Sequence, residues 1–329
     1  HYIVPEFSRD TAFSLSSTKA IDEYEEAKAH GVETRPVLIG PVSFLLLGKT
    51  QEDGLHALDL LDDLLPVYAE VLQALADAGA DAVQLDEPTL VLDLSDEERA
   101  AFTQAYEALS DAADLDLHVA TYFGGLEDNL PTALDLPIDA LHLDLDRGAG
   151  QLQAALDHGV PDDLALSLGV IDGRNVWRAD LDSLLETVQA AVDALGTDRV
   201  LVGPSCSLLH VPVDLDTEPA LSDDMKRWFA FAAQKVEEIV ALAERVDGNE
   251  EATEALFEKS RAARKARAQS DWINYGGVQD RVAGIDASIT DRHAPHAQRA
   301  PLHHRALDLP ALPPTPSVSR PVGTDAQRE

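Results

Sequence analysis

The chain has 329 residues, of which 60 are acidic and 25 basic, so its formal net charge at pH 7 is -35. This charge argues against nucleic acid or an anionic membrane as a partner, and no apolar run approaches the roughly 18–20 residues that span a bilayer. A single cysteine, Cys206, excludes an internal disulfide and indicates a reducing, cytoplasmic compartment. The acidic residues are dispersed, so we interpret them as a solvated surface suited to a high-salt cytoplasm. An ordinary acidic protein is the alternative.

Short apolar segments alternate with helical ones along the first two thirds of the chain. The segments with the character of buried strands are 35–42, 82–88, 115–122, 140–145, 163–170 and 199–203. Segments with helical apolar spacing lie between them, as at 62–80 and 178–195. This alternation predicts βα units and a parallel sheet. Because no Gly-x-Gly-x-x-Gly motif occurs, we favour a (β/α)8 TIM-type barrel over a dinucleotide-binding sheet.

The predicted barrel is incomplete at its N-terminal side. A closed barrel has eight strands, and residues 1–7 supply only the end of one, so we expect the first strand to be missing. Such a barrel has two exposed edges, and we expect self-association through them.

After the last strand the character of the sequence changes. Long amphipathic helices are predicted at 223–246 and 250–269, followed by a segment rich in turn residues and a Pro-rich tail. We therefore divide the chain into three predicted parts. They are an incomplete N-terminal (β/α) barrel at 1–248, a helical and irregular extension at 249–308, and an interdomain linker, or the start of a missing catalytic barrel, at 309–329.

Asp86 and Glu87 end the strand Ala82–Pro88 and are the most prominent candidate site residues. In barrels and open α/β sheets, ligands bind at the carboxyl ends of the strands. The alternative is that the two carboxylates cap a helix or pair with a basic side chain.

Other candidates have weaker spacing. His142 and Asp144 face one side of a strand and, with Cys206, could be metal ligands, but polar packing at strand ends explains them better. Cys206 with His210 could form a nucleophile and base, although a buried structural thiol is favoured. His118 is interpreted as a core histidine. The segment 172–178 is interpreted as a turn and N-cap, with its tryptophan packed on the barrel rim.

Six runs carry a resemblance to a known family. They are HYIVPEF (1–7), RPVLIGPVSFLLLGK (35–49), LLPVYAEVLQALADAGADAVQLDEPTLVLDL (64–94), VIDGRNVWRADL (170–181), GPSCSLLHVPVDL (203–215) and KRWFAFAAQKVEE (226–238). In this order they resemble the N-terminal half of cobalamin-independent methionine synthase, the 5-methyltetrahydropteroyltriglutamate–homocysteine methyltransferase.

The resemblance implies an enzyme of two face-to-face (β/α)8 barrels that transfers a methyl group from 5-methyltetrahydrofolate polyglutamate to homocysteine. The C-terminal barrel would hold zinc, homocysteine and the catalytic histidine. The N-terminal barrel would be a scaffold that helps to hold the polyglutamate tail. We therefore expect no cofactor in this chain, zinc in a C-terminal barrel that is missing here, and no activity of this chain alone.

The resemblance also assigns roles to single positions. The zinc barrel's His-x-Cys corresponds here to Ala120-Thr121-Tyr122, its zinc glutamate falls near Asp144, and its last zinc cysteine falls at Cys206. The last two are therefore relic metal positions, and no metal is expected.

No catalytic residue is predicted for this chain. The predicted weak substrate contacts at the barrel mouth are His1, Asp86, Glu87 and His210. The expected partner is the C-terminal catalytic barrel, in cis or in trans. The alternatives are a non-catalytic interaction module that docks on a separately encoded catalytic barrel, or a truncated product without function.

Overall fold

The computed structural model describes residues 4–308, which form two compact units. One unit is Val4–Arg267, and the other begins at Ala268. His1 and the Pro-rich segment 309–329 lie outside the described residues. No helix within the described range has the length and apolar character needed to cross a membrane.

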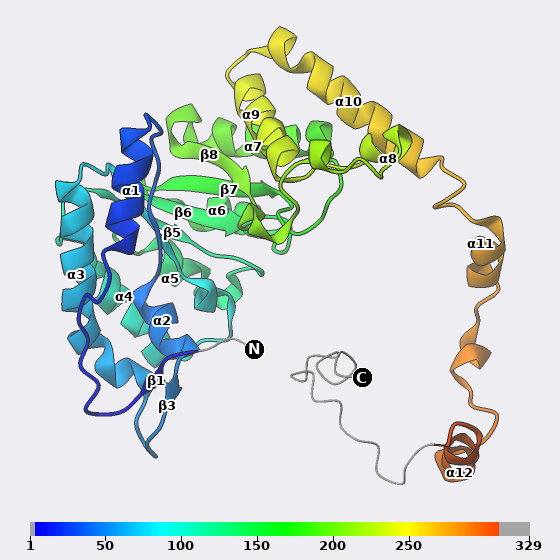
Figure 1. Ribbon diagram of the computed structural model, residues 1–329, viewed down its shortest axis with the longest axis horizontal. Helices are drawn as coiled ribbons and strands as arrows, with labels where there is room; N and C mark the ends of the chain where they lie inside the picture. The colour runs from blue at the N-terminus through cyan, green and yellow to red at the C-terminus, as the bar shows by residue number, and fades with distance from the viewer. Residues whose placement is uncertain (1–3, 309–329) are drawn as a thin grey trace. The chain divides into compact units, whose positions relative to one another are not determined.

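A parallel six-stranded sheet forms the centre of the larger unit (Figure 1). Its strands are β2 (Val37–Ile39), β4 (Ala82–Asp86), β5 (Asp116–Ala120), β6 (Ala140–Asp144), β7 (Ala165–Ile171) and β8 (Val200–Pro204). They are hydrogen-bonded in this sequential order, which is the order of a (β/α) barrel. The predicted parallel α/β architecture is confirmed, and the barrel is open between β2 and β8 in the described part of the chain. Strands β1 (Glu6–Phe7) and β3 (Lys49–Thr50) form a separate parallel pair.

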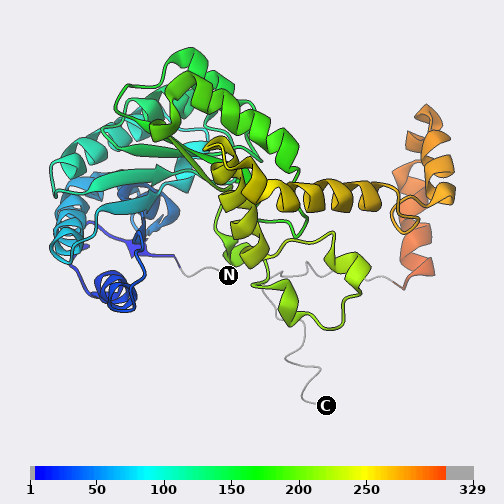
Figure 2. The same cartoon turned by 90° about the horizontal axis from the view of Figure 1, so that it is seen from above.

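Helices alternate with these strands and pack on the outer side of the curved sheet (Figure 2). They are α1 (Lys19–Ala29), α2 (Pro41–Leu47), α3 (Leu61–Asp77), α4 (Asp96–Ser110), α5 (Leu130–Leu134), α6 (Gln151–His158) and α7 (Leu181–Leu195). Three further helices follow β8: α8 (Asp223–Lys226), α9 (Ala232–Val246), which packs against α7 and β8, and α10 (Glu250–Ala268). The core lies between this helical layer and the sheet. In β4, for example, Val83 and Leu85 are fully buried in the core, whereas Gln84 and Asp86 point to the opposite, inner face.

The edge strands leave apolar side chains exposed. Val37 and Ile39 of β2 are 54% and 39% exposed, and Leu201 of β8 is 40% exposed. The expected self-association through these edges stays a prediction.

The single helix predicted over 223–246 is wrong, because the structure divides this segment into α8 and α9. Between them, Phe229 forms an antiparallel bridge with Trp177. The N–H of Ala230 donates to the carbonyl of Val176 at 2.9 Å. The N–H of Phe229 still bonds to the preceding turn, but that of Ala230 bonds to the segment before α7, so the helix cannot continue past this point.

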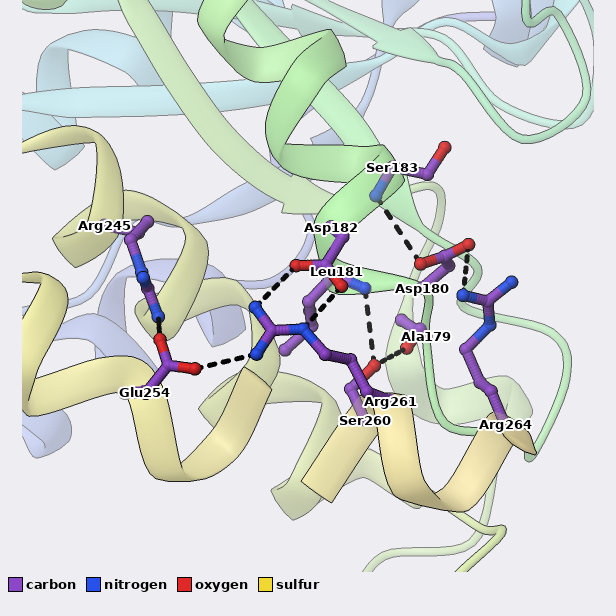
Figure 3. A network of polar contacts seen from close by, with 10 residues as sticks. All are labelled: Ala179, Asp180, Leu181, Asp182, Ser183, Arg245, Glu254, Ser260, Arg261 and Arg264. Carbon is purple, nitrogen blue, oxygen red and sulfur yellow. Dashed lines mark hydrogen bonds and ion pairs between the residues drawn. The ribbon is translucent and has the colours of Figure 1, made fainter. Parts of the chain in front are cut away.

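Helix α10 is fixed to the start of α7 by a polar network (Figure 3). Arg261 makes a bidentate pair with Asp182, at 2.7 and 2.8 Å, and contacts Glu254 at 2.7 Å. Beside it, the buried Ser260 hydroxyl donates to the carbonyl of Ala179 at 2.6 Å. Two positions of α10, Arg261 and Ser260, thus hold it at the start of α7.

The smaller unit contains two α-helices in the described range, α11 (Gly276–Ala283) and α12 (His296–Ala306). Neither has a buried residue. Large apolar side chains there are exposed, such as Trp272 at 71% and Ile289 at 63%.

Candidate functional site

The inner face of the sheet lines a cavity of about 660 Å³. Strand register places Asp86, Ala120, His142 and Ser167 in one row across β4, β5, β6 and β7. The three polar residues of this row, Asp86, His142 and Ser167, line the cavity. A polar row on the inner face, near the carboxyl ends of the strands, is the expected position of a site in this architecture.

Asp86 is held by its neighbours on this face. Its Oδ1 accepts from Gln84 Nε2 at 2.9 Å and from the Tyr122 hydroxyl at 3.0 Å. Burial raises the pKa of Asp86, and these two hydrogen bonds oppose the rise. The carboxylate is therefore fixed within the protein and half-buried at the cavity wall.

His142 is the most enclosed polar group of the row. Its Nδ1 is 2.9 Å from Ser167 Oγ, and its buried Nε2 has no hydrogen-bond partner within residues 4–308. Burial lowers the pKa of His142 to about 4, so the imidazole is neutral at neutral pH. The rings of Tyr122 and His142 meet edge to face, with their centroids 5.7 Å apart.

Glu87 lies on the other side of the sheet and is fully buried. Its Oε2 accepts from Ser43 N at 2.8 Å and its Oε1 from the Tyr106 hydroxyl at 3.0 Å. Ser43 belongs to the first turn of α2, so the carboxylate caps that helix. Burial raises the pKa of Glu87 to about 7.

Asp144 organises two loops. Its Oδ2 accepts from Phe123 N at 2.8 Å, and its Oδ1 accepts from Asp146 N at 3.1 Å and from Arg147 N at 2.9 Å. It is only 1% exposed. One of the residues that it holds, Phe123, has a φ of 73°, a left-handed conformation that is unfavourable for a bulky residue.

His210 lies at the outer rim, next to Phe123. The two rings meet edge to face with centroids 5.8 Å apart. Both line a second cavity of about 340 Å³, together with Asp86. The structure thus brings Asp86, His210 and Cys206 to the same end of the sheet. Asp86 and His210 line the smaller cavity, and Asp86 and Cys206 line the cavity of about 660 Å³.

The turn predicted at 172–178 lies beside a second buried polar cluster. Lys235 Nζ of α9 is 3.3 Å from Asn175 Oδ1 and 3.4 Å from the Trp177 carbonyl. Glu238, one turn further, is 3.6 Å from Arg178. Burial lowers the pKa of Lys235 and raises that of Glu238 to about 7. The cluster joins α9 to the segment before α7.

Sequence reasoning did not select Tyr122 or Gln84, which hold Asp86 in place. Both could have been found from position alone. Gln84 is two residues before Asp86 on the same strand, hence on the same face. Tyr122 follows the next strand, β5, at the same end of the sheet. His118, interpreted as a core histidine, is half-buried and contacts the guanidinium of Arg35.

The residues present do not fit the zinc implied for the family. Asp144 already accepts three backbone hydrogen bonds. Burial raises the pKa of Cys206, which keeps the thiol protonated. Ala120 and Tyr122 offer neither imidazole nor thiolate. Within residues 4–308, no group of three or more His, Cys, Asp and Glu side chains could hold a metal ion.

Comparison with known proteins identifies the relatives of this chain. Residues 1–196 match the family described as cobalamin-independent synthase, N-terminal domain. A 5-methyltetrahydropteroyltriglutamate–homocysteine methyltransferase of Salinibacter ruber is 80% identical over 328 residues, and one of Caulobacter vibrioides is 50% identical over 329. Both alignments cover 100% of this chain, but only 43% and 42% of the relatives.

A solved structure supports the fold. A B12-independent methionine synthase from Shewanella sp. W3-18-1, solved in complex with selenomethionine, aligns with a TM-score of 0.55 at 15% identity. The alignment covers 74% of this chain and 70% of that one. At this identity the likeness concerns the fold alone.

Proposed function

The chain belongs to the cobalamin-independent methionine synthase family, of which it is the N-terminal half, and we propose that it is the non-catalytic half of a methyltransferase. The complete protein would transfer a methyl group from 5-methyltetrahydropteroyltriglutamate to homocysteine, as the names of its relatives state. Zinc and homocysteine would be held by the C-terminal half. The reaction would take place in the cytoplasm.

The observation that carries this proposal is the state of the polar groups at the sheet's inner face. Asp86 accepts hydrogen bonds from Gln84 and Tyr122, and Asp144 accepts hydrogen bonds from backbone N–H groups. A group that attacks a substrate or takes its proton needs a free lone pair within reach of it. Asp144 accepts three backbone hydrogen bonds, and Asp86 accepts both of its hydrogen bonds at Oδ1, which leaves only Oδ2 open to the cavity. We therefore propose that both carboxylates mainly support the protein, as expected of a scaffold.

Of the four predicted weak substrate contacts, Asp86 and His210 remain proposed ones at the mouth. Glu87 is no longer proposed, because it is fully buried against α2 on the other side of the sheet, and His1 lies outside the described residues.

The test is reconstitution with the C-terminal portion of the 80% identical relative. Methionine formation is measured for each half alone and for their mixture. We expect neither half alone to turn over and the mixture to form methionine, with a rate that saturates in the concentration of this chain. Turnover by this chain alone would refute a non-catalytic role. Full turnover by the C-terminal portion alone would refute the need for this half.

The alternative is an interaction module that docks on a separately encoded catalytic barrel. The exposed apolar edges of β2 and β8 favour a binding partner of some kind. Analytical ultracentrifugation of the same mixture distinguishes a stable complex at micromolar concentration from two separate proteins.

A further inference from the structure

Residues 268–308 differ in charge from the rest of this acidic chain. They contain five aspartates, four arginines and four histidines but neither glutamate nor lysine, so their formal net charge is -1. Residues 1–267, by contrast, contain 53 acidic and 19 basic residues and have a net charge of -34. A high net charge keeps a protein surface soluble and apart from other proteins, and this segment lacks such a charge.

Apolar side chains are exposed along the same segment. Val278 and Val282 lie four residues apart on one face of α11, and each is more than half exposed. Ile285 and Ile289, which follow this helix, are also more than half exposed. Of the twenty large apolar side chains that are exposed within residues 4–308, nine belong to 268–308. Exposed apolar side chains gathered in one part of a protein are typical of an interaction site.

The composition of the segment is that of a protein–protein interface. Interfaces are enriched in arginine and depleted in lysine and glutamate relative to the rest of the surface. Residues 268–308 contain four arginines and neither of the other two types, whereas the preceding helix α10 contains four glutamates and two lysines. The charges and the exposed apolar side chains therefore both indicate that this surface is covered by protein.

The partner that fits this surface is the C-terminal half of the complete protein. The chain is the N-terminal half and spans 43% of its Salinibacter ruber relative, and 268–308 is the described part closest in sequence to the other half. Helix α12 has two arginines, three histidines and no acidic residue. We expect the rest of so acidic a protein to offer carboxylates that complement this helix.

We propose that residues 268–308 form a docking surface for the C-terminal half. Val278 and Val282 make apolar contacts with it, and the basic side chains of α12 face its carboxylates. This inference rests on the proposed function, in which the two halves work together. It assigns part of their contact to the extension after the barrel, and none of its residues is a proposed substrate contact.

The test follows amide hydrogen exchange of the full chain by mass spectrometry, alone and mixed with the C-terminal portion of the 80% identical relative. Methionine formation is measured in the same mixture. We expect exchange at 276–306 to be fast in the chain alone and to slow by about tenfold or more in the mixture, because docking suppresses local opening. Exchange in α3 is the internal reference and should stay unchanged.

Two double variants test the apolar contact. Val278→Ser/Val282→Ser should raise the Kd of the complex by about tenfold or more, because two valines would no longer be buried on binding. Val236→Ser/Val240→Ser on α9 is the matched control, with the same residue type, the same spacing and a similar exposure, and it should leave the Kd unchanged. Sedimentation velocity gives both values, and equal thermal unfolding shows that the variants keep the fold.

The outcomes separate this inference from the proposed function. A mixture that forms methionine without slower exchange at 276–306 would overturn the docking surface and leave the proposed function intact. Equal Kd values for the two double variants, or exchange at 276–306 already as slow as in α3 for the chain alone, would also overturn the docking surface. No complex and no methionine formation would count against both.

Discussion

The buried carboxylate of Glu87 lies so close to Gly40 that it restricts which residue position 40 can hold. The carboxylate is buried against the first turn of α2, whose N-cap is Gly40. A Cβ added at Gly40 would lie 2.1 Å from Glu87 Oε1, closer than any real contact. Position 40 therefore has room only for glycine as long as the carboxylate keeps its place.

We predict that Gly40→Ala destabilises the protein by about 1–3 kcal/mol, the usual cost of overpacking a core. Urea unfolding followed by circular dichroism measures this. Gly150→Ala is the matched control, because a Cβ at that N-cap position would meet nothing within 4 Å. A loss at Gly150 as large as that at Gly40 would contradict the steric explanation.

The buried state of Glu87 also predicts a pH dependence. Burial raises its pKa from an ordinary value of 4.5 to about 7, so the folded state binds this proton more tightly than the unfolded state does. The contribution of Glu87 to stability is then greatest below pH 4.5 and falls as the pH rises to 7.

Glu87→Gln cannot ionise and should lose this dependence. Between pH 5.5 and 7.5, the free energy of unfolding of the unsubstituted protein should fall by about 2 kcal/mol more than that of the variant. Urea titrations at both pH values give the difference, and Glu107→Gln on the exposed surface is the control. Parallel pH profiles for the two proteins would show that Glu87 does not titrate in this range.

At the scale of elements, the attachment of α10 depends on one small buried hydroxyl. Ser260 is 2% exposed and donates to the Ala179 carbonyl, while its oxygen is 3.5 Å from Leu181 N. Ser260→Ala leaves both backbone groups without this partner, and we predict a loss of about 1–2 kcal/mol. Ser110→Ala, which removes an exposed hydroxyl bond, should cost less than about 0.5 kcal/mol. Equal losses, measured by urea unfolding, would contradict this.

The strands were predictable because their patterns are local, whereas several contacts between elements were not. Val83 and Leu85 alternate with polar neighbours and belong to a strand on this ground alone. The break between α8 and α9 could not be predicted, because it depends on pairing of Phe229 with Trp177, some fifty residues away. In the same way, Asp86 and Glu87 are adjacent in sequence yet lie on opposite faces, and only the position of α2 shows which one caps a helix.

For the whole molecule, the net charge of -35 predicts a stability that depends on salt. Raising NaCl from 0.1 to 1 M shortens the Debye length from about 10 to 3 Å and weakens repulsion among surface carboxylates. The free energy of unfolding should rise by more than about 1 kcal/mol, the scale of a single exposed charge pair. Urea unfolding at the two salt concentrations measures this, with sucrose as the uncharged control. Unchanged stability would contradict an adaptation to high salt.

The central claim is that this chain works as one half of a larger methyltransferase. The chain has a mass of 35.4 kDa and spans 43% of its Salinibacter ruber relative. The most direct test is intact mass spectrometry of the native protein, isolated from its source cells with an antibody against this sequence. The account predicts one polypeptide of more than twice 35.4 kDa. A polypeptide of 35.4 kDa would contradict it and would favour a separate module that docks on a catalytic barrel.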